Sequence, residues 1–83
     1  LEQNYPNPFN PSTLIKYSLS ENTSVRLSVY DVLGREVAVL VNEFKTSGSY
    51  EVSFSGDDLS TGVYYYRLDA GTFVETKKML MIK

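Results

Sequence analysis

The chain has 83 residues and a mass of 9.4 kDa, enough for one small domain but not for two independent hydrophobic cores. Its content of 42% hydrophobic and 22% charged residues excludes an intrinsically disordered chain and an integral membrane protein. A net charge of -2 without a basic cluster argues against binding to nucleic acid or to an anionic membrane.

The sequence contains no cysteine and no histidine, so disulfides, thiolate sites and the commonest catalytic base and metal ligand are all missing. We therefore expect no enzyme, no cofactor and no small-molecule substrate. The longest apolar run, residues 37–41, is far shorter than the roughly 20 residues of a membrane helix, and no leader is expected within this sequence.

All three prolines lie within the first 11 residues. Alternating prolines remove backbone donors and helical dihedrals, so we expect an extended lead-in over residues 1–12 and a β-sandwich over residues 13–83. Tyr5 and Phe9 are the side chains available to anchor the lead-in. Two interpretations stay open, namely a linker packed against one edge of the domain and a recognition arm.

Period-two alternation predicts short strands along most of the remaining chain. The side chains that share one face of their strands are Ile15, Tyr17, Leu19, Val25, Leu27, Val29, Tyr50, Val52, Phe54, Tyr64, Tyr66 and Leu68. Aromatic side chains bury large areas, so we expect Tyr64 and Tyr66 at the centre of the core. Polar clusters with turn residues separate these segments.

Residues 31–34 predict a hairpin turn with a bulge, because Asp31 suits the first position of a turn and Gly34 accepts a positive φ. The run 35–41 is almost entirely apolar after Glu36, which fits a buried helix or a buried strand. Its β-branched valines and short length favour a strand covered on both sides.

Residues 73–82 alternate again and predict the last one or two strands. One face holds Val74, Thr76, Leu80 and Ile82, and the other holds Glu75, Lys77, Met79 and Met81. Of these we expect Leu80 and Ile82 in the core, and the ammonium groups of Lys77, Lys78 and Lys83 in solvent. The whole pattern predicts an all-β fold, an antiparallel β-sandwich of about seven short strands.

Few residues in the sequence suggest a metal-binding or ligand-binding site. Asp57 and Asp58 follow Gly56, which fits ordinary turn chemistry better than a calcium site, because no regular acidic spacing accompanies them. Tyr30 and Tyr65 would both face outward and form a small aromatic platform for a sugar ring. An accessory immunoglobulin-like module that binds carbohydrate or a neighbouring domain therefore stays open as an alternative function.

Residues 59–66 resemble the tyrosine corner of immunoglobulin domains, in which Tyr64 closes the corner through its hydroxyl and Tyr66 stands where a disulfide cysteine would be. The resemblance implies an immunoglobulin-like antiparallel β-sandwich. Across the chain, four blocks are similar to the C-terminal sorting domain of proteins exported by the type IX (Por) secretion system of Bacteroidetes-type bacteria. They are NYPNPFNP (4–11), VYDVLGREV (29–37), LSTGVYYYRL (59–68) and TKKMLMIK (76–83). The motif positions expected to be structural are Pro6, Pro8, Gly34, Gly62, Tyr64 and Tyr66.

The resemblance implies a secretion signal for a covalently linked cargo on its N-terminal side. The partners it implies are outer-membrane translocon proteins and a sortase that cuts near Leu1 and attaches the cargo to anionic lipopolysaccharide. Export would proceed through the periplasm to the cell surface or the exterior. The segment expected to be recognised comprises Lys77, Lys78, Met79, Leu80, Met81, Ile82 and Lys83, with a terminal edge free to pair with a receptor strand. Met79 and Met81 depart from the valine or leucine common in the family.

Overall fold

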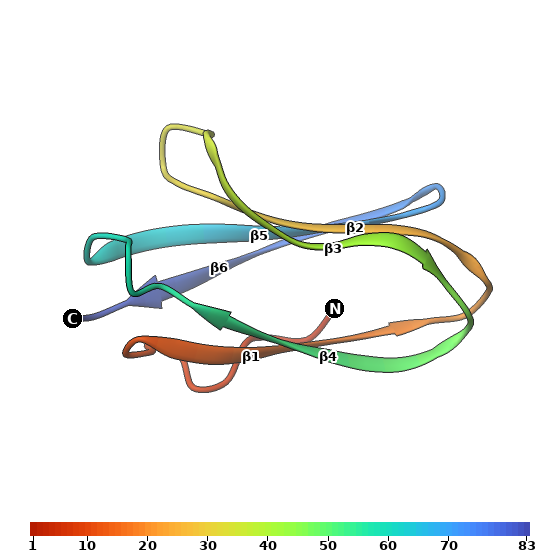
Figure 1. Ribbon diagram of the computed structural model, residues 1–83, viewed down its shortest axis with the longest axis horizontal. Helices are drawn as coiled ribbons and strands as arrows, with labels where there is room; N and C mark the ends of the chain where they lie inside the picture. The colour runs from red at the N-terminus through yellow and green to blue at the C-terminus, as the bar shows by residue number, and fades with distance from the viewer.

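The computed structural model describes residues 1–83 and contains six strands and no helix. The strands are β1 (Ser12–Leu19), β2 (Thr23–Tyr30), β3 (Glu36–Lys45), β4 (Gly48–Ser55), β5 (Gly62–Ala70) and β6 (Phe73–Met81). They form a two-stranded sheet, β1-β4, and a four-stranded sheet, β3-β2-β5-β6, with every neighbouring pair antiparallel. Figure 1 shows the two sheets as two layers. The predicted β-sandwich is confirmed, with six strands against the expected seven or so.

The core lies between the two layers and consists of 13 buried hydrophobic side chains. They are Phe9, Ile15, Tyr17, Leu19, Val25, Leu27, Val29, Phe54, Tyr64, Tyr66, Leu68, Met79 and Met81. In β1 buried and exposed residues alternate strictly, as one-sided burial of a strand requires. The placement of Tyr64 and Tyr66 in the core is therefore confirmed, and Tyr17 stacks on Tyr50 with ring centroids 5.4 Å apart.

The β2–β3 hairpin projects from the sandwich (Figure 1). Asp31 stabilises its turn through hydrogen bonds. One carboxylate oxygen of Asp31 accepts the backbone N–H groups of Leu33 at 2.9 Å and Arg35 at 3.0 Å. These backbone bonds, that of Arg35 above all, lower the pKa of the Asp31 carboxyl. Gly34 has φ +81°, a conformation that favours glycine, so the predicted turn is confirmed.

The prediction that residues 35–41 form a strand is confirmed, but the prediction that it is covered on both sides is wrong. β3 is an edge strand of the four-stranded sheet, and Val37 and Val39 are exposed. Its pairing with β2 also contains two register shifts. An apolar run alone does not distinguish an interior strand from an edge strand, because both satisfy the same local propensities.

The prediction of which side chains of the last strand face the core is also wrong. Met79 and Met81 are buried, whereas Leu80 is 37% exposed and Ile82 45% exposed. The register decides this, because Met79 lies opposite the core residue Tyr64 and opposite residues of paired strands share a face. Residues 79–82 are all apolar, so alternation fits both phases equally well.

Candidate functional site

The predicted recognition segment, residues 77–83, is divided by the structure into a buried and an exposed set. Lys78 and Leu80 face solvent on the outer side of β6, and Ile82 is exposed just beyond the end of this strand. Lys77 lies on the inner side, where its Nζ is 3.7 Å from a carboxylate oxygen of Glu75. Lys83 donates from Nζ to the carbonyl oxygen of Asp57 at 2.8 Å. Lys78 and Lys83 are therefore exposed, as the sequence predicted, whereas Lys77 is only partly exposed.

The backbone edge of this segment is occupied by the lead-in. The N–H of Phe9 donates to the carbonyl of Leu80, and the N–H of Ile82 donates to the carbonyl of Phe9, both at 2.9 Å. The side chains of Asn7 and Gln3 complete the cover by bonding the N–H of Leu80 at 3.0 Å and the carbonyl of Lys78 at 2.8 Å. An edge free for a receptor strand, as the sequence suggested, is therefore not present over residues 78–82.

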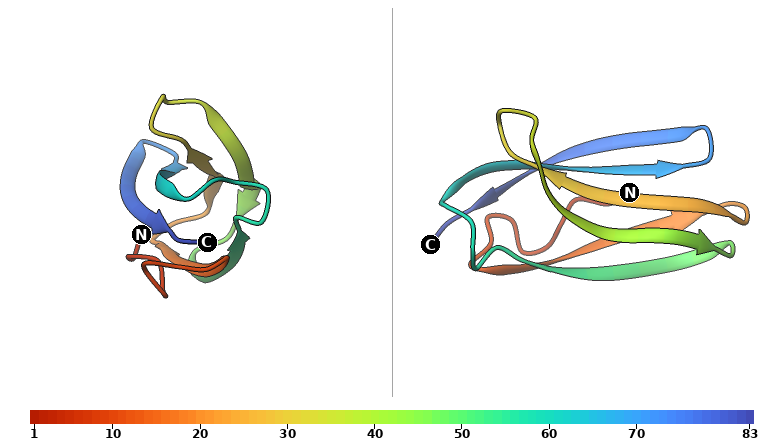
Figure 2. Two further views of the ribbon diagram at one scale, coloured as in Figure 1. Left: turned by 90° about the vertical axis from the view of Figure 1, so that its left-hand side faces the viewer. Right: turned by 45° about the horizontal axis from the view of Figure 1, so that its top comes forward.

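The first residues of the lead-in pair with the other sheet. Glu2 donates its N–H to the carbonyl of Lys16 at 2.9 Å, and Tyr5 exchanges two backbone hydrogen bonds with Leu14. The lead-in therefore bridges the outer edge of β1 and the outer edge of β6. Figure 2 shows this segment, in red, beside β1.

Tyr66 and Asn4 hold the lead-in from inside the sandwich. The Tyr66 hydroxyl donates to the carbonyl of Glu2 and accepts the N–H of Asn4, both at 2.8 Å. The Asn4 side chain is buried and donates to the Thr13 hydroxyl and the Pro6 carbonyl, both at 3.1 Å. Sequence reasoning missed Asn4, since an asparagine in a proline-rich segment is typical of any turn and carries no sign of burial.

Burial raises the pKa of Tyr66 and of Tyr17 above the ordinary value of 10.0. A raised pKa favours the neutral phenol in the folded state, so this contribution to stability is complete below pH 10 and is lost as the pH rises through the folded-state values. We therefore expect the melting temperature to fall steeply above pH 10, with part of the tyrosinate absorbance appearing only as the protein unfolds. A single step in which all seven tyrosines ionise near pH 10, with the fold intact, would contradict this.

Of the remaining motif residues, Tyr64 and Pro6 make hydrogen bonds within the domain. The Tyr64 hydroxyl donates to the carbonyl of Ser60 at 2.6 Å, the bond expected of a tyrosine corner. Gly62 is the first residue of β5. The Pro6 carbonyl accepts the Thr13 hydroxyl at 2.9 Å, whereas Pro8 is exposed.

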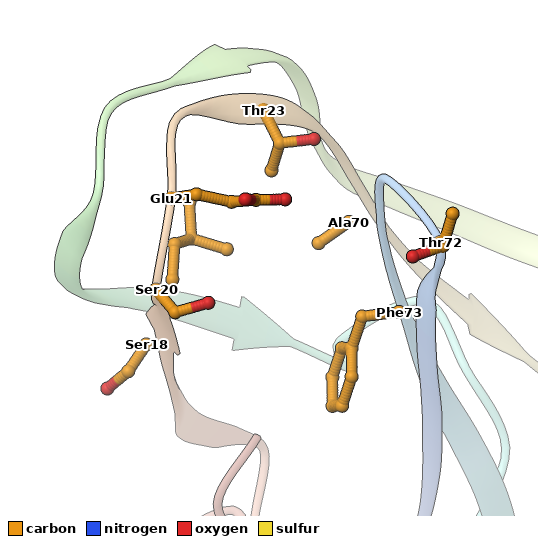
Figure 3. Close-up of a pocket in the computed structure, with 8 residues that line it drawn as sticks. Ser18, Ser20, Glu21, Thr23, Ala70, Thr72 and Phe73 are labelled. Atoms are coloured by element: carbon orange, nitrogen blue, oxygen red, sulfur yellow. The ribbon is translucent and has the colours of Figure 1, made fainter.

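A hollow on the surface between two connections does not resemble a catalytic site. It has a volume of about 460 Å³ and lies between the β1–β2 connection and the β5–β6 turn (Figure 3). Its lining residues are Ser18, Leu19, Ser20, Glu21, Thr23, Ala70, Thr72 and Phe73. Glu21 is the only carboxylate there, so the hollow lacks the pair of groups that acid–base chemistry uses.

No group of three or more acidic, histidine or cysteine side chains is placed to hold a metal ion. No helix has the length and apolar character needed to cross a membrane.

The sequence matches the family model described as the secretion system C-terminal sorting domain over residues 3–83. The chain belongs to this family. No curated protein and no solved structure matches it significantly. As a type IX secretion sorting domain it serves export out of the cell, and the all-β fold agrees with that assignment.

Proposed function

We propose that this sorting domain directs a covalently linked N-terminal cargo through the type IX translocon to the cell surface or the exterior. The observation that supports this proposal is the family match over residues 3–83, together with an exposed basic and apolar surface on β6. We name this surface the β6 face and define it as Lys78, Leu80, Ile82 and the terminal Lys83.

The translocon reads the β6 face through its side chains in this proposal. The backbone groups along residues 78–82 are already bonded to the lead-in, so strand addition at this edge would first have to displace Phe9 and Asn7. The side chains of Leu80 and Ile82, by contrast, are accessible without any rearrangement. Exposed apolar side chains flanked by lysine are a usual composition for a protein-binding surface.

A sortase would cut before Glu2 in this proposal. In this proposal the lead-in (residues 1–12) and the sandwich (residues 13–83) form one folded unit, because the lead-in is hydrogen-bonded to both sheets. A cut between Glu2 and Phe9 would separate groups that hold the β1 and β6 edges. Cleavage on the cargo side of Glu2 releases the cargo and leaves the domain folded.

The test is a double charge reversal on the β6 face. Lys78→Glu with Lys83→Glu should abolish export of a fused reporter in a host that has the system, because it replaces two positive charges by two negative ones. Both side chains are exposed, so the melting temperature should stay within a few degrees of the parent. Export is measured by surface and culture-medium reporter activity, and stability by thermal denaturation of the purified domain.

The matched control makes the same change in net charge with four glutamates at exposed polar positions away from β6, namely Ser12→Glu, Asn42→Glu, Ser47→Glu and Thr72→Glu. This control should fold and export normally. If the β6 variant folds and exports like the parent, charge recognition at the β6 face is refuted. If the control also loses export, net charge is responsible and the β6 face is not.

A second candidate function is carbohydrate binding, which one observation favours. Tyr30 and Tyr65 are direct partners in the β2–β5 register and share the outer face of the sheet beside Arg67. Sugar rings stack on such tyrosine pairs. The double variant Tyr30→Ala, Tyr65→Ala separates the two functions, because it would remove sugar binding in titration calorimetry while leaving reporter export unchanged.

A further inference from the structure

Four strands lie at sheet edges, and three of them are protected against pairing with another chain. Unpaired edges present rows of N–H and C=O groups, so natural proteins cover them, interrupt them or turn charges inward along them. The lead-in covers β1 and the C-terminal half of β6. Along the N-terminal half of β6, Glu75 and Lys77 lie on the inner side of the sheet, opposite the core residues Leu68 and Tyr66.

β3 is protected by two other devices. Its register against β2 shifts twice, which interrupts the regular spacing of the outer backbone groups. It also turns Glu43 and Lys45 toward the inner side, where they form an ion pair of 2.9 Å and Lys45 lies 5.0 Å above the ring of Tyr50.

β4 has none of these devices. Its register with β1 is unbroken from Ser12 opposite Ser55 to Leu19 opposite Gly48. The inward side chains are uncharged, namely Tyr50, Val52 and Phe54, and the outward ones are Ser49, Glu51, Ser53 and Ser55. β4 is therefore the regular edge that this fold leaves open.

The hydrogen-bond pattern identifies which backbone groups on β4 are free. The N–H of Gly56 donates to the carbonyl of Pro11 at 2.8 Å and continues the β1–β4 ladder. Because antiparallel pairs alternate, even-numbered residues of β4 bond to β1 and odd-numbered residues point away. The free groups belong to Ser49, Glu51, Ser53 and Ser55.

We propose that β4 pairs antiparallel with β4 of a second copy of this chain, about a two-fold axis at Val52. The register is Ser49 opposite Ser55, Tyr50 opposite Phe54, Glu51 opposite Ser53 and Val52 opposite Val52. This register joins the free backbone groups in bonding pairs and places apolar side chains opposite apolar ones on the inner side.

Neighbouring registers are less favourable. An axis at Glu51 sets two glutamates directly opposite each other, and like charges in that position destabilise a sheet. An axis at Ser53 shortens the paired length and sets Tyr50 opposite Gly56. A single strand pair buries less than the roughly 1,200 Å² of a stable interface, so the dimer is weak and concentration-dependent.

Opposite charges introduced at Ser53 test both the surface and the register. In the proposed dimer, residue 53 faces Glu51 of the partner subunit, and this contact occurs twice. Ser53→Lys should tighten dimerisation about three- to tenfold, and Ser53→Glu should weaken it by a similar factor. The 83-residue chain and both variants are compared by sedimentation equilibrium from micromolar to millimolar concentration. Ser53 is exposed, so the variants keep the parental melting temperature at low concentration.

Ser53→Pro provides an independent variant, because it removes an outward N–H without removing a bond to β1 and should reduce dimerisation at least tenfold. The proposal is supported if the two charges act in opposite directions and concentration-dependent amide shifts map to residues 49–55. It is overturned if the parent stays monomeric at millimolar concentration, if both charges act alike, or if the shifts map to β3 or β6, which would indicate pairing at another edge.

Discussion

Replacing Phe9 by alanine should lower the free energy of unfolding by about 3–5 kcal/mol, the usual cost of removing a buried phenylalanine. The Phe9 side chain is 1% exposed, and its ring meets Phe54 edge to face with centroids 6.0 Å apart. Domains of this size are stabilised by only about 5–15 kcal/mol, so the loss is a large share of the total. Urea denaturation followed by tyrosine fluorescence measures the change in midpoint.

Tyr5→Ala is the matched control within the same lead-in. Tyr5 is 80% exposed, so its removal should change stability by less than about 0.5 kcal/mol. The sequence treats Tyr5 and Phe9 as equivalent anchors, but of these two side chains only that of Phe9 is buried in the core. Equal denaturation midpoints for the two variants would show that the lead-in is not part of the core.

Replacing Tyr66 should have a comparable effect, and two substitutions separate its ring from its hydroxyl. Tyr66→Ala removes a fully buried ring and should destabilise the domain by about 3–5 kcal/mol. Tyr66→Phe keeps the ring but leaves the buried N–H of Asn4 and the carbonyl of Glu2 without their partner, at a cost of about 1–3 kcal/mol. Amide hydrogen exchange at Asn4 should accelerate in both variants.

The neighbouring Tyr65→Phe is the control, because Tyr65 lies on the outer face and makes no hydrogen bond through its hydroxyl within the chain. Its denaturation midpoint should match the parent. If Tyr66→Phe were as stable as Tyr65→Phe, the Tyr66 hydroxyl would not be what holds residues 2–4 in place.

The two Tyr66 variants also report on the link between folding and export. Tyr66→Phe leaves the β6 face chemically unchanged, so any loss of reporter export in this variant would follow from loosening of the lead-in. Comparison with the double charge reversal, Lys78→Glu with Lys83→Glu, distinguishes loss of export through a loosened lead-in from loss of export through an altered β6 face.

Local sequence was sufficient for the strands and for the β2–β3 turn. Alternation identified the buried faces of β1, β2 and β5, because a strand covered on one side needs apolar residues at every second position. Asp31 and Gly34 specified their turn through short-range bonds and one positive φ. Tyr64 was placed correctly at its corner because its partner, Ser60, lies only four residues away.

Tertiary structure alone decided three other features. The phase of residues 79–82 depended on the register against β5, since four consecutive apolar residues satisfy either phase. The exposure of β3 depended on its place at the edge of the sheet. The lead-in joins Asn7 to Leu80 and Asn4 to Tyr66, contacts 73 and 62 residues apart along the chain. Alternation and turn chemistry act over a few neighbouring residues, so they carry no information about which distant strand a segment will meet.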